Sequence, residues 1–202
     1  MTAPRRPAVA LAPPPELSAA DRSRLVAWAR AAIVAAVTSG APPEVDPAGL
    51  DDDLRAPHAA FVTLREEGEL RGCIGSLDFA RPLWRSVLDA AVSAALDDPR
   101  FRPVEPTELP RIRLSISVLQ PPVELPDPAD FEPMTHGIIV ERDWHRALLL
   151  PKVAGEFGWG ARETLDAVCH KAGLPADAWR DRRTRLKVFS ALEFDEVATV
   201  GY

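Results

Sequence analysis

Three segments of the chain are predicted to form helices, and apolar residues recur at helical spacing in the first two. The first helix follows Ser18, a residue type that caps helix N-termini, and we expect Gly40 to end it as the C-terminal cap. The second begins near Pro82 and ends before Pro99, because a residue that precedes proline disfavours the α conformation. The third covers residues 161–172.

Alternation of apolar and polar residues predicts the strands. The clearest case is residues 111–119, where Ile112, Leu114, Ile116 and Val118 would share one face and the other face would be polar. Further strands are predicted over residues 61–64, 70–77, 137–140, 147–150 and 187–193. Because helices and strands follow each other without a regular strand–helix–strand repeat, the predicted fold class is α+β, with a mainly antiparallel sheet flanked by helices.

The main candidate chemistry lies in the hairpin predicted between Phe61 and Gly75. Gly68 suits its turn, because glycine adopts positive φ at no steric cost. Side chains alternate between the two faces of a strand. The returning strand is therefore predicted to have one face with Leu70, Gly72 and Ile74 and another face with Arg71, Cys73 and Gly75.

This predicted arrangement of Arg71 and Cys73 has two interpretations. A guanidinium near a thiol favours the thiolate, which is the nucleophilic and metal-binding form of cysteine. Gly72 and Gly75 lack side chains, so a ligand or another chain would be able to approach the backbone closely. Alternatively, Cys73 is a buried structural residue and Arg71 pairs with a nearby carboxylate. The sequence leaves both interpretations open.

His136 is the histidine with the strongest case for a functional role. It precedes Gly137 just ahead of a predicted strand, and it would act as a base if folding brings it near Cys73. The alternative is a hydrogen-bonded loop histidine. Cys73, Cys169, His136 and His170 are possible zinc ligands by type, but they lack the spacing of a zinc site, so no metal site is predicted. No nucleotide-binding or hydrolase motif is present, and no cofactor is expected.

Composition argues against several classes of function. The length of 202 residues fits one domain. The net charge of −6 argues against nucleic-acid binding, because nucleic acids are themselves negatively charged. A basic run at residues 180–187 is the weaker, nucleic-acid-binding alternative to a solvated surface. No apolar run is long enough to cross a bilayer, and no signal-peptide pattern is present. Two cysteines do not suggest a disulfide scaffold, so a reducing, cytoplasmic setting is expected.

Proline marks the tail and the connections of the chain. The 21 prolines cluster between the predicted elements and near the N-terminus. Residues 1–16 are predicted to form a proline-rich, disordered tail, because such a segment cannot form a packed element. Residues 17–202 are predicted to form the folded domain.

The strand Leu70-Arg71-Gly72-Cys73-Ile74-Gly75 and the preceding Phe61-Val62-Thr63-Leu64 closely resemble the AMMECR family. Similar segments follow in the same order at residues 98–101, 117–119, 136–138, 149–153 and 169–174, and then at Trp179. The resemblance runs from about residue 17 to the end of the chain. Lys152 departs from the family pattern, which usually has a glutamine there, and a lysine cannot accept a hydrogen bond.

This resemblance implies a fold and partners, but no established reaction. The family fold is α+β, with a larger subdomain built from both chain ends and a smaller one from the middle. Many prokaryotic members look like one part of a three-component set, AmmeMemoRadiSam, which includes a Memo-like protein and a radical SAM protein. This chain resembles the A component of that set, so an accessory or catalytic role beside those two partners is expected.

Within such a role, the hairpin is expected to form the site. Cys73 would be the nucleophile or carrier, Arg71 its electrostatic support and His136 a proton-transfer group. The expected ligand-binding residues around them are Gly72, Ile74 and Gly75. The alternative is a non-enzymatic binding or adaptor module, in which the glycine-containing strand receives a partner's chain. The sequence leaves the oligomeric state open.

Overall fold

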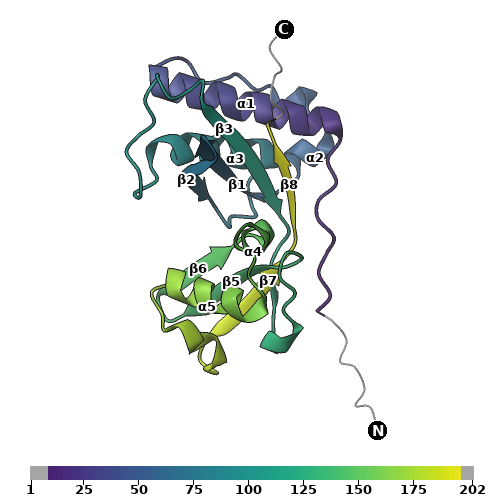
Figure 1. The fold of residues 1–202 in the computed structure, drawn as a ribbon. Helices are drawn as coiled ribbons and strands as arrows, with labels where there is room; N and C mark the ends of the chain where they lie inside the picture. Colours follow the sequence, from purple (N-terminus) through teal and green to yellow (C-terminus); the bar gives the residue numbers. More distant parts are fainter. Residues whose placement is uncertain (1–8, 197–202) are drawn as a thin grey trace. The chain divides into compact units, whose positions relative to one another are not determined.

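The computed structural model of the protein describes residues 9–196 and confirms the α+β class (Figure 1). The described chain divides into two compact units. The larger unit contains residues 15–119 and 192–196, and the smaller unit contains residues 9–14 and 120–191. Each unit has its own four-stranded sheet and its own apolar core.

The sheet of the larger unit has the strand order β2-β1-β3-β8. Its strands are β1 (Ala59–Glu66), β2 (Glu69–Gly75), β3 (Ile112–Leu119) and β8 (Ala191–Asp195). The central strand β1 pairs antiparallel with both β2 and β3. Helices α1 (Ala19–Thr38) and α3 (Leu83–Leu96) pack against each other, and α3 also packs against β1 and β2. The shorter elements are η1 (Pro47–Gly49) and α2 (Asp52–Arg55).

The predicted alternation along β3 is confirmed. Ile112, Leu114, Ile116 and Val118 are all buried in the core of the larger unit. The intervening Ser115 lies opposite Thr63 of β1, on the other face of the sheet. One face of this sheet is therefore apolar and packs against helices, whereas the other carries hydroxyl groups.

The sheet of the smaller unit has the strand order β4-β7-β5-β6, and all its neighbours pair antiparallel. Its strands are β4 (Val123–Glu124), β5 (Gly137–Arg142), β6 (His145–Leu149) and β7 (Arg185–Phe189). Its helical elements are η2 (Pro128–Asp130), α4 (Pro151–Phe157), α5 (Ala161–Lys171) and η3 (Ala176–Arg180). Ile138, Val140, Val168 and Val188 are fully buried in the core of this unit.

The single final strand predicted over residues 187–193 is wrong, because the segment forms parts of two strands. Strand β7 ends at Phe189, Ser190 interrupts the pattern, and β8 begins at Ala191 in a different sheet. Both halves contain strand-forming residues. The local pattern therefore predicts a strand but does not show where the chain changes sheets.

The N-terminal tail is described only from residue 9. Residues 1–8 of the predicted disordered tail lie outside the described residues. Residues 9–16 contain no helix or strand, yet Val9 and Leu11 pack against the core of the smaller unit. The Ser190 hydroxyl also donates a hydrogen bond to the Ala12 carbonyl at 2.7 Å.

No helix among residues 9–196 is long and apolar enough to cross a lipid bilayer. The longest helix, α1, begins as predicted, because the Ser18 hydroxyl accepts a hydrogen bond from the Asp21 amide at 3.0 Å. The predicted C-terminal cap is wrong by one residue. Ser39, not Gly40, takes the left-handed conformation, with φ of 56°, and its N–H donates to the Ala35 carbonyl.

We expect Ser39→Gly to raise the free energy of unfolding by about 0.5–1 kcal/mol, measured by urea denaturation. An L-residue in the left-handed region costs about 1–2 kcal/mol, and the greater entropy of glycine in the unfolded chain offsets part of that gain. The matched control Ser39→Ala keeps a Cβ and should give no gain. A glycine variant less stable than the parent would contradict the left-handed cap.

Candidate functional site

The candidate hairpin joins β1 to β2 through a two-residue turn. Glu67 and Gly68 have φ values of 53° and 89°. Positive φ at both central residues is typical of a type I′ turn, whose twist suits an antiparallel hairpin. The glycine expected at the turn is therefore confirmed, and the left-handed Glu67 precedes it.

A β-bulge interrupts the alternation of side chains along β2. Leu70 lies opposite Arg65, whereas Gly72 lies opposite Leu64, the residue that directly precedes Arg65 in β1. Arg71 is the extra residue between these pairs. The simple alternation predicted from Leu70 to Gly75 therefore fails at Arg71, while Gly72 onward remains in regular pairing with β1.

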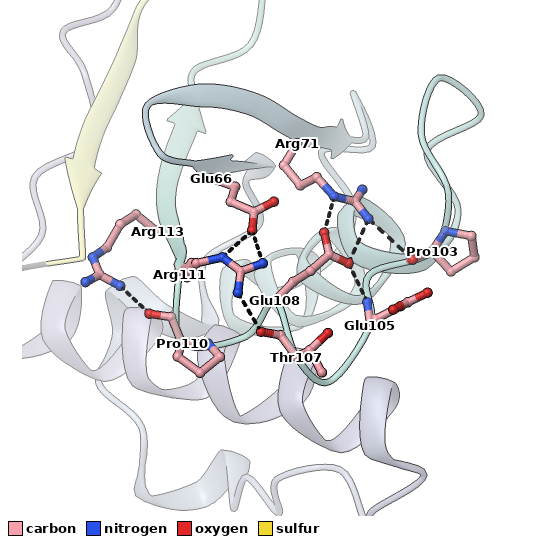
Figure 2. Close-up of polar contacts among 9 residues, drawn as sticks. All are labelled: Glu66, Arg71, Pro103, Glu105, Thr107, Glu108, Pro110, Arg111 and Arg113. Atoms are coloured by element: carbon pink, nitrogen blue, oxygen red, sulfur yellow. Dashed lines mark hydrogen bonds and ion pairs between the residues drawn. The ribbon is translucent and has the colours of Figure 1, made fainter.

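Arg71 pairs with Glu108, in the segment that leads into β3 (Figure 2). The Arg71 Nε donates to Oε1 of Glu108 at 2.7 Å, and Nη2 donates to Oε2 at 3.1 Å and to the Pro103 carbonyl at 3.3 Å. The hydrogen bond from Arg71 is the main cause that lowers the pKa of Glu108. A carboxylate thus neutralises Arg71, as in the structural interpretation, and no hydrogen bond joins Arg71 to Cys73.

Cys73 is an unpaired, half-buried cysteine opposite Thr63 of β1. The Thr63 hydroxyl donates a hydrogen bond to the Cys73 sulfur at 3.4 Å. The main chain of Cys73 is held on its outer side, since its N–H donates to Asp98 Oδ2 at 2.8 Å and its carbonyl accepts from Arg100 Nη2 at 3.3 Å. The guanidinium beside Cys73 is therefore that of Arg100, not Arg71.

The Asp98 carboxylate organises this outer side of β2. It accepts hydrogen bonds from Arg100 Nε at 2.9 Å and Nη2 at 2.7 Å, in addition to the one from Cys73. The Asp98 side chain is only 2% exposed. The hydrogen bonds from Arg100 are the main cause that lowers the pKa of Asp98 to about 2, although burial acts in the opposite direction. Asp98 is therefore ionised at neutral pH and anchors Cys73.

Asp98, Arg100 and Thr63 were not among the predicted site residues. The one sequence signal that points to Asp98 and Arg100 as site residues is that they lie in a segment that resembles the family. The hydrogen bond that the Cys73 N–H of β2 donates to Asp98 spans 25 residues of sequence, so local patterns do not predict it. The position of Thr63 depends on the register of the hairpin, which the turn sets.

The two glycines of this strand allow close packing inside the larger unit. A Cβ on Gly72 would lie 2.2 Å from the Ala94 carbonyl oxygen of α3. A Cβ on Gly75 would lie 2.3 Å from Phe61 Cγ. The missing side chains thus leave space for a helix and for a phenyl ring. Ile74, the third predicted ligand-binding residue, packs against the core.

His136 belongs to the smaller unit, whereas Cys73 belongs to the larger one. His136 is 7% exposed, and its Nδ1 accepts a hydrogen bond from the Glu132 amide at 3.1 Å. Burial lowers the pKa of His136, which favours the neutral ring. Because Nδ1 is an acceptor, the proton of the neutral ring is on Nε2. His136 is thus presented as a hydrogen-bond donor through Nε2.

The other candidate sites have structural explanations. Cys169 is fully buried in the smaller unit, and within residues 9–196 no three potential metal-binding side chains are gathered. In the basic run, Arg183 pairs with an aspartate, and Arg185 and Lys187 pair with glutamates. Arg180 lies over the ring of Trp179, 4.6 Å from its centroid. Carboxylates thus neutralise much of the charge that would attract a nucleic acid.

We expect Asp98→Asn to lower the free energy of unfolding by about 2 kcal/mol at pH 7, since a pKa held about two units below the ordinary value stabilises the folded state by that amount. The depressed pKa of Asp98 contributes its full stabilisation of the folded state above about pH 4, and this stabilisation is lost as the pH falls towards about 2. The difference between parent and variant should shrink over the same range. Urea denaturation at several pH values measures it.

The neighbouring Asp97 provides the matched control, because it is exposed at the end of α3. Asp97→Asn should change the free energy of unfolding by less than about 0.5 kcal/mol at pH 7. Equal losses for the two variants would contradict a specific role for the Asp98 carboxylate.

Comparison with known proteins supplies the family. A family model described as AMMECR1 matches residues 26–194. A protein of Methanothermobacter thermautotrophicus is 47% identical over 156 residues, covering 74% of this chain and 81% of the relative. A protein of Methanopyrus kandleri is 41% identical over 186 residues, covering 88% of this chain and 89% of the relative. 

The fold of this family is also known from a solved structure. The crystal structure of an uncharacterized protein from Pyrococcus horikoshii matches with a TM-score of 0.82 at 36% identity. The match covers 87% of this chain and 91% of that chain. The family model and the relatives each span most of the sequence, including the hairpin that carries Cys73. The chain therefore belongs to the AMMECR1 family.

Proposed function

We propose that this protein is an accessory or catalytic component that acts with a Memo-like protein and a radical SAM protein, and that its site centres on Cys73. The observation that carries the proposal is the setting of this thiol. Cys73 is unpaired and half-buried, its sulfur faces the Thr63 hydroxyl, and Asp98 and Arg100 hold its main chain. A cysteine held in one geometry is suited to serve as a nucleophile or carrier.

In this proposal, the residues around Cys73 have roles that differ from those expected from the sequence. The Thr63 hydroxyl would stabilise negative charge on sulfur, because it is a donor aimed at that atom. Arg71 would support the site indirectly, since its charge is matched by Glu108. Gly72 and Gly75 would shape the strand, and Ile74 would support it from the core side. His136, if it takes part, would donate a proton or hydrogen bond through Nε2.

The adaptor alternative requires a partner's chain to pair with the edge of β2. At Cys73 both outward main-chain groups already have partners, Asp98 for the N–H and Arg100 for the carbonyl. A partner strand would have to displace a buried, ionised carboxylate to pair there. This cost favours a role for the thiol over strand addition at Cys73. Two free cysteines suit a reducing compartment, so we place this activity in the cytoplasm.

We expect iodoacetamide to modify Cys73 and to leave Cys169 intact in the folded protein, as measured by intact-mass spectrometry over time. Cys73 is half-buried, whereas Cys169 is fully buried and its burial raises the pKa of the thiol. Cys169→Ser should keep the labelling, and Cys73→Ser should abolish it. Labelling of Cys73 only after addition of urea would contradict an accessible thiol.

The functional test is reconstitution with the Memo-like and radical SAM proteins of the same source. Native mass spectrometry measures the complex, and consumption of S-adenosylmethionine measures turnover. If Cys73 has a catalytic or carrier role, Cys73→Ser should keep the complex and lower turnover by at least about 100-fold. Cys169→Ser is the matched control and should keep both. The absence of a complex, together with unchanged turnover when this protein is omitted, would refute the proposal.

A further inference from the structure

One aromatic ring links the two arginine–carboxylate pairs beside strand β2. Phe101 lies in the segment between α3 and β3. The guanidinium carbon of Arg100 lies 5.4 Å from the centroid of this ring, and that of Arg71 lies 5.9 Å from it. Among residues 9–196, no other aromatic ring has two guanidinium groups over it. Phe101 is therefore a contact shared by two arginines from different segments of the chain.

Both contacts have the distances of cation–π interactions, in which a guanidinium lies within about 6 Å of a ring centroid. The carboxylates of Glu108 and Asp98 match the charges of the two arginines, but this does not exclude the ring. The N–H groups of a guanidinium lie in its plane, so they still bind a carboxylate when an aromatic ring lies beside that plane. The ring and the carboxylates thus stabilise the same two side chains together.

Arg100 connects the Phe101 ring to Cys73. Its Nε and Nη2 donate to the Asp98 carboxylate, and Nη2 also donates to the Cys73 carbonyl. Asp98 in turn accepts the hydrogen bond of the Cys73 N–H. The Arg100 side chain is 48% exposed, so burial alone does not fix its rotamer. The ring of Phe101 supplies a contact that restricts this half-exposed side chain.

Arg71 connects the same ring to the bulge of β2. Its guanidinium binds Glu108, and it is the extra residue of the bulge, two positions before Cys73. The main chain of Phe101 is fixed as well, since its N–H donates to the Asp98 carbonyl at 3.1 Å. The ring therefore joins the bulge of β2 to the segment that holds Cys73.

We infer that Phe101 is a positioning residue for Cys73. Its ring holds the guanidiniums of Arg71 and Arg100, and through Arg100 it keeps the main chain of Cys73 in one orientation. The rate of a reaction depends on how well the reacting atoms are aligned, so a fixed main chain favours reaction at the thiol. This role rests on the proposed function of Cys73, and it adds to that site a residue with no reactive group of its own.

The test is hydrogen exchange of the Cys73 amide, measured by NMR in the full chain. This N–H exchanges when its hydrogen bond to Asp98 opens, so its rate reports how firmly Cys73 is held. Phe101→Leu keeps an apolar side chain and removes the aromatic face. Because each cation–π contact at an exposed site is worth about two- to fivefold in an equilibrium, loss of both should speed the exchange about 5- to 30-fold. Unchanged exchange in Phe101→Leu would overturn the inference.

A conservative variant and a matched amide show whether the ring face is the cause. Phe101→Tyr keeps the aromatic face, so exchange at Cys73 should stay within about twofold of the parent. The Arg183 N–H also donates to an aspartate carboxylate, that of Asp181 at 3.0 Å, and should exchange at the parental rate in Phe101→Leu. The same acceleration in Phe101→Tyr as in Phe101→Leu, or at both amides, would contradict a role for the ring face at Cys73.

A second aromatic-to-leucine variant tests for a general effect of losing a ring. Phe157 is an exposed residue of the smaller unit, and no guanidinium of the described chain lies over its ring. Phe157→Leu should leave exchange at Cys73 unchanged. If Phe101→Leu does not fold, Phe101→Met replaces it, because methionine is flexible and adapts to irregular packing. The same acceleration at Cys73 is expected, and its absence would overturn the inference.

Turnover separates this inference from the proposed function on which it rests. In the system reconstituted with the Memo-like and radical SAM proteins, Phe101→Leu should keep the complex and lower turnover by at least about fivefold, and Phe101→Tyr should retain turnover. If Cys73→Ser lowers turnover but Phe101→Leu does not, the positioning role is refuted and the proposed function stands. If Cys73→Ser keeps full turnover, the proposed function is refuted, and exchange at Cys73 still decides whether Phe101 holds that residue.

Discussion

The close approach of helix α3 to strand β2 at Gly72 is the constraint on which the candidate site depends. A Cβ at this position would lie 2.2 Å from the Ala94 carbonyl oxygen, so only glycine permits the contact. Because the helix packs so near the strand, the turn after its last residue brings Asp98 to the outer side of β2. The conformation of Cys73 therefore follows from packing that involves no reactive group.

Charge around the hairpin is almost fully balanced. Arg71 is matched by Glu108 and Arg100 by Asp98, each through both carboxylate oxygens, and Figure 2 shows Arg111 paired with a single oxygen of Glu66. The first two pairs fix the segments that flank β2, because bidentate guanidinium–carboxylate pairs are directional as well as attractive. Because carboxylates match their charges, the arginines near Cys73 act mainly by holding these segments in place. The polar group aimed at the sulfur itself is a neutral hydroxyl, that of Thr63.

The edge of β2 combines a closed part and an open part. An exposed strand edge attracts other chains, and proteins often cover such edges to prevent non-specific pairing. Asp98 and Arg100 cover the edge at Cys73 with side-chain hydrogen bonds. At Gly75, no residue of the described chain outside the sheet bonds to the main-chain N–H or carbonyl.

The sequence by itself determined the elements whose signals are local and periodic. The alternation along β3, the Ser18 cap of α1 and the glycine turn of the hairpin each depend on neighbouring residues, and each is found as predicted. The characteristic Leu-Arg-Gly-Cys-Ile-Gly segment also identified the family. Only the tertiary structure decided that Arg71 is a bulge residue paired with Glu108, that Asp98 and Arg100 hold Cys73, and that the final strand is divided at Ser190. These features depend on contacts between residues far apart in the chain, and the local periodicity of a sequence does not predict such contacts.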